Sequence, residues 1–200
     1  MNLNKIEEIK GFMPSHEGET LTKWAMQFSK IGPIMEIGTY CGKSSMYLSI
    51  GAKKNKQIVF TLDHHAGSEE HQLDEEYFDK EIYDYKNKRV NTLPLLIKNI
   101  NKLKVKNIVP IISESSVAAS NWNTDLGILF IDGGHSFESA NNDYLFWESK
   151  IIQGGVLIIH DIFEDPNEGG QAPYEIYQKA LNNNYKVYER EDTLVCLIKC

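Results

Sequence analysis

Three groups of acidic and histidine side chains stand immediately after short apolar runs in this sequence. The groups are Asp63 with His64 and His65, Asp132 with His135, and His160 with Asp161. Carboxylates and imidazoles together can hold a divalent cation, and an imidazole can accept a proton near neutral pH. Loops collect polar residues in any fold, so a purely structural origin stays an alternative. The pattern nonetheless favours a site for acid–base or cation-assisted chemistry.

The segment EIGTYCGKSS, residues 36–45, contains a glycine turn with informative spacing. A phosphate-binding P-loop needs four residues between its two glycines, whereas three separate Gly38 from Gly42. A dinucleotide-binding turn has a glycine where Tyr40 stands, so that the pyrophosphate can approach. Asp63, at the end of the next apolar run, can accept hydrogen bonds from ribose hydroxyls. The turn favours a nucleoside without phosphates, such as S-adenosylmethionine, and leaves a nucleoside triphosphate site as the alternative.

The elements that must position these groups follow from hydrophobic patterning. Five nearly continuous apolar runs, typical of parallel strands buried on both faces, cover residues 33–37, 57–62, 107–112, 126–131 and 155–160. Helical spacing of apolar residues lies between them, at 42–52, 91–103, 137–147 and 173–181. Two last strands, 185–189 and 193–199, are joined by so short a link that they must form an antiparallel hairpin. The sequence predicts a doubly wound α/β fold, with a mostly parallel seven-stranded sheet and that hairpin at its C-terminal edge.

In such a sheet the carboxyl ends of the parallel strands meet at one edge, where ligands bind. The three groups are therefore expected to lie together. A length of 200 residues predicts a single domain, 1–200, with 1–30 as an N-terminal helical cap. The acidic, tyrosine-rich segment 64–91 is too long for a plain connection and is expected to be an inserted lid or substrate loop.

The amino-acid composition limits the kinds of molecule that the protein is expected to bind. The formal net charge is -7, and Arg89 and Arg190 are the only arginines, which argues against nucleic acid and favours a small molecule. Three cysteines without a C-x-x-C pair suit a reducing, cytoplasmic location. No apolar run approaches the length of a membrane span. The sequence leaves open whether the protein forms a homodimer.

The segment from Glu36 to Ser44 resembles motif I of the class I S-adenosylmethionine-dependent methyltransferases, and is closest to the metal-dependent catechol-type O-methyltransferases. The stretch IDGGHSFESANNDYLFWESKIIQGGVLIIHD, residues 131–161, is similar to the Asp-Gly-x-His pattern of a related bacterial methyltransferase group. Order and spacing match from Glu36 to Asp161. The resemblance implies a Rossmann-like methyltransferase fold and a cofactor, S-adenosylmethionine.

The resemblance also implies roles for the cofactor-binding residues. Those around the methionine part would be Gly38, Tyr40, Gly42 and Ser44, with Glu36 holding the ammonium group directly or through water. Asp63 would bind the ribose, and Glu114 with Ser115 would approach the adenine. Serine is also favoured at a helix N-terminus, which is a structural alternative for Ser44 and Ser115.

In the catechol-type enzymes a divalent cation is held by an aspartate and an Asp-Asn pair. Asp132 and the pair His160-Asp161 occupy those places, so a histidine replaces one acid and an aspartate replaces the amide. Magnesium prefers oxygen ligands and imidazole suits manganese, iron, nickel or zinc, which leaves the metal open. The alternative for His160 is a buried histidine bonded to a carbonyl.

His135 lies three residues after Asp132, where the catechol-type enzymes have a lysine that removes the acceptor proton. A histidine can serve as that base, with Asp132 as its catalytic neighbour, or it can simply order the start of a helix. The sequence thus predicts an O-methyltransferase acting on a hydroxyl of a small molecule. Two alternatives are a metal-independent methyltransferase and a non-catalytic nucleotide-binding protein on the same fold. The acceptor and the roles of His64 and His65 are left open.

Overall fold

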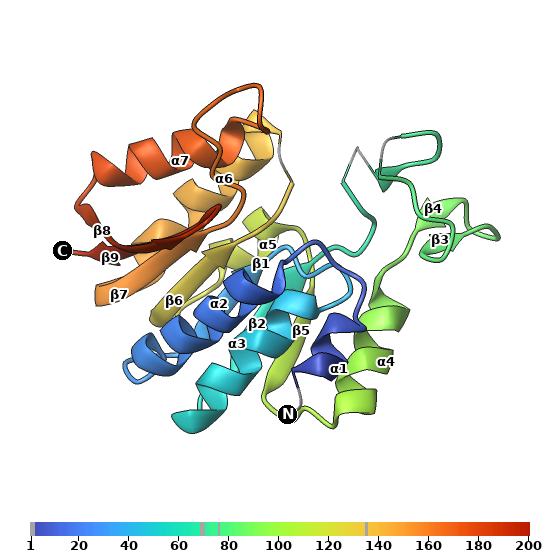
Figure 1. Cartoon of the computed structure of the whole chain (residues 1–200), viewed down its shortest axis with the longest axis horizontal. Helices are drawn as coiled ribbons and strands as arrows, with labels where there is room; N and C mark the ends of the chain where they lie inside the picture. The colour runs from blue at the N-terminus through green and yellow to red at the C-terminus, as the bar shows by residue number, and fades with distance from the viewer. Residues whose placement is uncertain (1–2, 69–70, 76, 135) are drawn as a thin grey trace.

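The protein forms one seven-stranded sheet covered by helices on both faces (Figure 1). The computed structural model describes residues 3–68, 71–75, 77–134 and 136–200. In the order in which they pair, the strands are β5 (Ile108–Ile112), β2 (Val59–Asp63), β1 (Ile34–Ile37), β6 (Leu126–Ile131), β7 (Ile151–Ile159), β9 (Leu194–Lys199) and β8 (Tyr185–Glu191).

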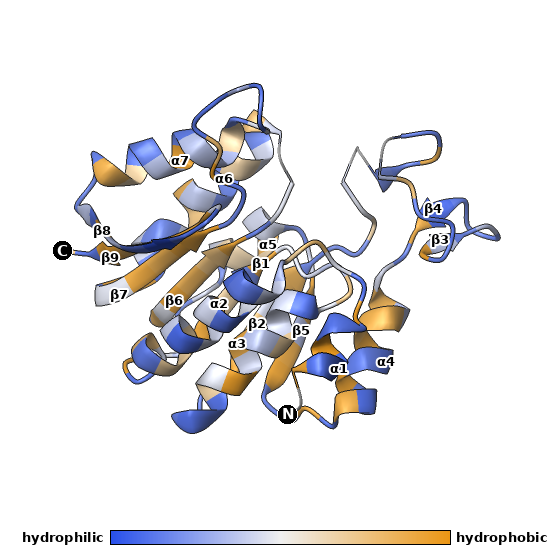
Figure 2. Cartoon of the chain, in the orientation of Figure 1, coloured by the Kyte–Doolittle hydropathy of each residue, from blue (hydrophilic) through white to orange (hydrophobic). Residues whose placement is uncertain are grey.

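The strand directions are those predicted. The five strands from β5 to β7 are parallel, while β9 pairs antiparallel with both β7 and β8. Apolar residues fill these central strands, which are largely orange in Figure 2. β7 starts at Ile151 rather than at 155, since Gly154 and Gly155 continue the strand instead of interrupting it. The carboxyl ends of the parallel strands thus meet at one edge.

The helices form two groups, and each group packs against one face of the sheet through its own apolar core. The face that buries Trp24 and Tyr47 is covered by α1 (Asn4–Glu7), α2 (Ser15–Phe28), α3 (Lys43–Lys54) and α4 (Leu93–Leu103). The face that buries Tyr144 and Trp147 is covered by α5 (Ser115–Ser120), α6 (Phe137–Trp147), the short 3₁₀ helix η2 (Glu148–Lys150) and α7 (Ala172–Leu181). The sequence missed α5, whose six residues are too few to show a helical period.

The N-terminal region is helical, and α2 packs closely on α3. A side chain at Gly18 would stand 2.3 Å from the Tyr47 ring, so glycine allows this approach. The close packing holds the start of α2 over the sheet edge at which the candidate residues gather. Among the described residues no helix has the length and apolar character to cross a membrane.

Segment 64–91 leaves the sheet after β2 and returns at α4, on the right of Figure 1. It contains a two-stranded antiparallel ribbon, β3 (Tyr83–Asp84) and β4 (Arg89–Val90), which sequence patterning did not indicate. Its Tyr77 ring packs edge-on against Phe12, with ring centroids 5.7 Å apart. Phe12 also contacts Tyr40 of the glycine turn at 5.6 Å. Aromatic contacts therefore join this segment, the N-terminal region and the turn.

Candidate active site

The glycine turn after β1 runs directly against the end of β6. Gly38 has φ +88°, and a Cβ there would lie 2.0 Å from the carbonyl oxygen of Asp132. Gly42 has φ +90°, and Tyr40 also adopts a positive φ of 50°. Only glycine, which has no Cβ, can adopt this positive φ without strain and also avoid a clash with Asp132 at position 38. The turn and Asp132 therefore share one corner of the sheet edge.

Asp63, at the end of β2, is tied to this turn. Its Oδ2 atom accepts hydrogen bonds from the backbone N–H groups of Thr39, at 3.0 Å, and Tyr40, at 2.9 Å. Its Oδ1 atom accepts one from the N–H of His65 at 2.6 Å. The sequence predicts a ribose ligand for this carboxylate, and it missed the role of Asp63 in closing the turn.

Glu36 lies fully buried beneath the turn. Its carboxylate accepts hydrogen bonds from the hydroxyls of Ser44, at 2.6 Å, Ser45 and Thr61. Burial raises the pKa of Glu36 to about 7, with a further contribution from the charge of Asp132, while the three hydroxyls oppose the shift. The sequence pointed to Glu36 and Ser44 but gave no signal for Ser45 and Thr61.

At the end of β5, Glu114 precedes the first turn of α5. The Ser115 hydroxyl accepts a hydrogen bond from Trp147 Nε1 at 2.9 Å and donates one to Asp143. Burial raises the pKa of Asp143 to about 6, and the charge of Glu114 adds to the shift. Asp143 went unnoticed in the sequence because it lies inside an otherwise apolar helical stripe.

His160, at the end of β7, sits between carboxylates on both sides of its ring. Its Nδ1 atom is 2.9 Å from Asp132 Oδ1 and 3.5 Å from Asp161 Oδ2. Its Nε2 atom is 2.8 Å from Glu17 Oε2. The sequence predicted the meeting of Asp132, His160 and Asp161, and the structure brings them together.

Glu17, in the first turn of α2, is the residue that sequence reasoning missed here. It is completely buried, and its Oε1 atom accepts hydrogen bonds from Thr193 N, at 2.9 Å, and Thr193 Oγ1, at 2.8 Å. Burial alone lowers the pKa of His160, but Asp132, Glu17 and Asp161 outweigh it and raise the pKa to about 11. The ring is an imidazolium while both of its nitrogens face carboxylates.

The same side chains fit a divalent cation. Asp132, His160 and Asp161 can each offer one ligand atom, and these atoms lie within 4.8 Å of one another. A histidine ligand commonly donates its second ring N–H to a carboxylate, which is the relation of His160 Nε2 to Glu17. That bond leaves Nδ1 facing the two aspartates, and once its proton is released this nitrogen could join them in a mixed oxygen and nitrogen site.

The other histidines that the sequence singled out are His64, His65 and His135. His135, predicted as the base, lies outside the described residues. His64 is exposed and accepts a hydrogen bond from the N–H of Ala66, whereas His65 is buried, with Nδ1 at 2.7 Å from Thr92 Oγ1. His65 therefore packs beneath the segment rather than at its surface.

Comparison with known proteins agrees with this architecture. Residues 35–162 match a family described as a methyltransferase domain. Among solved structures, the O-methyltransferase NovP superposes with a TM-score of 0.69 at 13% identity, covering 92% of this chain and 80% of its own. An O-methyltransferase from Bacillus cereus, in complex with SAH, has a TM-score of 0.63 at 13% identity, with 98% and 90% covered.

A third structure is the O-methyltransferase TomG from Streptomyces achromogenes, in complex with SAM. Its TM-score is 0.62 at 10% identity, and 94% of this chain and 81% of TomG are covered. At such identities the likeness shows a shared Rossmann-like methyltransferase fold. The family match spans the glycine turn, Asp132 and His160-Asp161, and so covers most of the sheet edge described above. The chain belongs to this methyltransferase domain family.

Proposed function

We propose that the protein transfers a methyl group from S-adenosylmethionine to a hydroxyl of a small molecule. The observation that carries the proposal is the contact between the two halves of the site. The glycine turn, fit for a phosphate-free nucleoside, stands against the backbone of Asp132, whose side chain meets His160. Two structural neighbours, TomG in complex with SAM and the Bacillus cereus O-methyltransferase in complex with SAH, support the choice of cofactor.

We assign the cofactor contacts as the resemblance implies. The methionine part would lie at Glu36, Gly38, Tyr40, Gly42 and Ser44, the ribose at Asp63, and the adenine at Glu114 and Ser115. The buried, hydrogen-bonded carboxylate of Glu36 supports a role near the ammonium group, because a nearby cation favours its charged form. Asp63 would act both on the ribose and on the turn that it holds.

A divalent cation would be held by Asp132, His160 and Asp161. When bound, such a cation lowers the pKa of a coordinated hydroxyl and so favours its deprotonation. The imidazole in this donor set favours manganese, iron, nickel or zinc over magnesium. His135 is proposed to take the acceptor proton, with Asp132 beside it in the sequence.

The acceptor would enter between the N-terminal region and segment 64–91. A groove of about 820 Å³ lies there, and Phe12, Tyr40 and Tyr77 supply aromatic walls beside the charged groups of Lys10 and Asp79. The groove reaches the glycine turn at Tyr40, but its lining does not include Asp132, His160 or Asp161. These surroundings suit a small molecule with both apolar and polar parts.

All three cysteines are free thiols, which supports a cytoplasmic location.

The test combines binding and transfer. Calorimetry should show S-adenosylmethionine binding more tightly than ATP or NAD. Asp132→Ala should abolish methyl transfer from radiolabelled S-adenosylmethionine to a panel of hydroxyl acceptors while leaving cofactor affinity within about threefold, since the Asp132 carbonyl that meets Gly38 belongs to the backbone, which the substitution keeps. Equal loss of binding and transfer would contradict the role of Asp132. Preference for ATP would refute the cofactor assignment.

One observation favours a second candidate function, a metal-independent methyltransferase. Both ring nitrogens of His160 bond carboxylates, so the imidazolium satisfies Asp132 and Glu17 by itself. In that case His135 would act without a cation. Transfer that survives exhaustive chelation would support this second candidate.

A further inference from the structure

We infer that Glu17 is a positioning residue for the cation site: it fixes the His160 ring so that Nδ1 faces Asp132 and Asp161. The inference rests on the cation site proposed above and adds to it a side chain from α2. Glu17 and its partner Thr193 both lie outside residues 35–162, the part that matches the family model. The N-terminal helix and the C-terminal hairpin would thus complete a site whose ligands belong to the family's core.

The contact between Glu17 and His160 determines the ring orientation. Glu17 is fully buried and His160 is 5% exposed, so water does not compete at their 2.8 Å hydrogen bond. A half-turn of the ring would put carbon atoms where Nε2 meets Glu17 and where Nδ1 meets Asp132. Both hydrogen bonds would then be lost in a buried place, which is costly.

The contact also selects the proton position that a cation needs. A cation held by Asp132 and Asp161 competes with the proton on Nδ1, and when that proton leaves, the carboxylate next to Nε2 keeps the remaining proton on Nε2. The lone pair then remains on Nδ1, which lies 2.9 Å from Asp132 and 3.5 Å from Asp161. Glu17 therefore favours the tautomer that presents a nitrogen donor to the two aspartates.

Glu17 is itself held from the opposite side. Two hydrogen bonds from Thr193, one from the backbone and one from the hydroxyl, occupy its Oε1 atom. Each carboxylate oxygen thus has a fixed partner, Oε1 at the turn between β8 and β9 and Oε2 at the ring. Such a doubly anchored carboxylate sets a ring more firmly than a solvated one.

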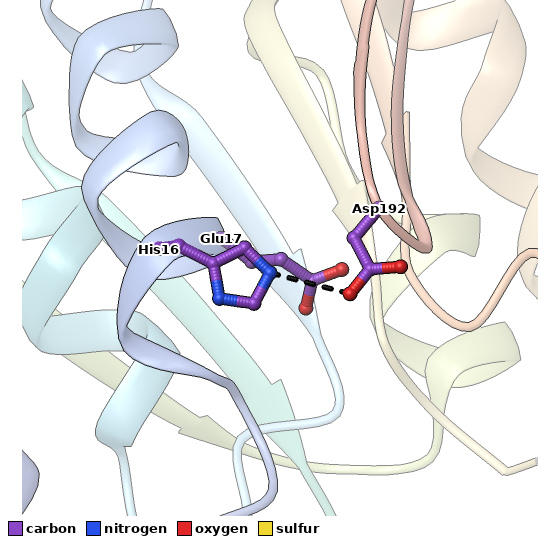
Figure 3. A group of neighbouring side chains, drawn as sticks. All are labelled: His16, Glu17 and Asp192. Carbon is purple, nitrogen blue, oxygen red and sulfur yellow. Dashed lines mark hydrogen bonds and ion pairs between the residues drawn. The ribbon is translucent and has the colours of Figure 1, made fainter.

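A neighbouring ion pair provides a matched control. His16 Nε2 lies 3.2 Å from Asp192 Oδ2, and Figure 3 shows both side chains beside Glu17. This pair joins α2 to the same turn, but its side chains are about half exposed and bond each other rather than His160. Removing it would loosen the docking of α2 without changing the partner of the ring.

The experiment measures Mn²⁺ binding, by electron paramagnetic resonance and calorimetry, on the full chain and its variants. In Glu17→Gln the amide oxygen can accept both bonds from Thr193, which turns the NH₂ group toward Nε2. That group donates, so it would place the ring proton on Nδ1 and block the donor. We expect Mn²⁺ affinity to fall about 10- to 100-fold, while His16→Gln stays within about twofold of the wild type.

The outcomes separate the two proposals. Wild-type Mn²⁺ affinity in Glu17→Gln, or an equal loss in His16→Gln, would overturn the role of Glu17 alone. A wild-type protein that binds S-adenosylmethionine but neither Mn²⁺ nor Zn²⁺ would overturn the cation site, and the inference with it. If circular dichroism shows Glu17→Gln unfolded, Thr193→Val replaces it. That variant removes one hydroxyl bond to Glu17 and should weaken Mn²⁺ binding severalfold, and unchanged affinity would again overturn the inference.

Discussion

The carboxylate of Asp63 accepts a hydrogen bond from the backbone N–H of Tyr40 at 2.9 Å, which joins the end of β2 to the turn after β1. A carboxylate predicted to bind a ligand thus also holds the backbone that would cradle the same ligand. Thr39 shares the same oxygen, and His65 bonds the other. Binding and folding are therefore coupled at this residue.

Asp63→Asn tests this coupling. An asparagine keeps one acceptor oxygen, so either the turn or His65 loses its hydrogen bond. We expect a loss of about 2 kcal/mol in the free energy of unfolding, together with at least a tenfold loss of S-adenosylmethionine affinity. Urea titration and calorimetry measure the two quantities. Asp84→Asn, at an exposed turn with similar backbone bonds, should lower stability less and leave cofactor affinity unchanged. Weakened binding with full stability would assign Asp63 to the ribose alone.

Glu36→Gln should change how stability depends on pH. Burial raises the Glu36 pKa to about 7, above an unfolded value near 4.5, so the folded protein binds the additional proton between these values. Stability contributed by the protonated form is full below pH 4.5 and is lost as pH rises through 7. A difference of this size is worth about 3 kcal/mol. Glutamine cannot ionise, so the free energy of unfolding of the variant should not fall in this way as the pH rises through 7.

Urea titrations of the wild type and Glu36→Gln at pH 5, 6, 7 and 8, without cofactor, measure the effect. Glu148→Gln, at a partly exposed carboxylate outside the site, provides the control and should follow the wild type. Parallel curves for Glu36→Gln and the wild type would show that Glu36 stays ionised throughout this range.

The strands were predictable because a strand that is buried on both faces appears in the sequence as a continuous apolar run. The end of each run marks the end of a strand, and the strand ends give the position of the site. The groups after β2, β6 and β7 were found in this way, and Asp132, His160 and Asp161 do meet. Glu17 was not predictable: it reaches His160 across 143 positions and Thr193 across 176. Local patterning carries no information on such contacts.

Short polar residues were missed for a related reason. Ser45 and Thr61 donate to Glu36 from α3 and β2, and their side chains reach it because β2 pairs in parallel with β1 and α3 packs on the same face of the sheet. In sequence, a serine at a helix start and a threonine in a strand are ordinary. Their role depends on strand register, which pairs Glu36 with Thr61.

Gly38→Ala should be far more harmful than Gly154→Ala, although both glycines have positive φ, +88° and +76°. The positive φ alone costs roughly 1–2 kcal/mol for an L-residue. At Gly154 nothing lies within 4 Å of an added Cβ, so only this strain applies. At Gly38 the Cβ would also meet the Asp132 carbonyl at 2.0 Å, and the turn must move.

We therefore expect Gly38→Ala to lower the free energy of unfolding by the strain cost and by several kcal/mol more, and to remove most of the cofactor affinity. Gly154→Ala should keep normal cofactor affinity. Urea unfolding and calorimetry on the two variants provide the comparison. Similar losses in both would show that the turn relaxes away from β6 without cost.

Replacement of the imidazole donor should change the metal that restores activity. After exhaustive chelation, the wild type is expected to recover transfer with Mn²⁺ better than with Mg²⁺, because His160 contributes nitrogen to the donor set. His160→Asp gives an all-oxygen set that suits Mg²⁺, but Glu17 would then face a second carboxylate. The double variant His160→Asp with Glu17→Gln removes that repulsion, and its ratio of Mg²⁺ to Mn²⁺ reactivation should rise at least about tenfold. Glu17→Gln alone, with His160 retained, is the control: its ring nitrogen is blocked and no oxygen donor replaces it, so it should lose Mn²⁺ reactivation without gaining Mg²⁺ reactivation. An unchanged ratio in the double variant would mean that His160 is not a ligand, and would leave it as the buried imidazolium between Asp132 and Glu17.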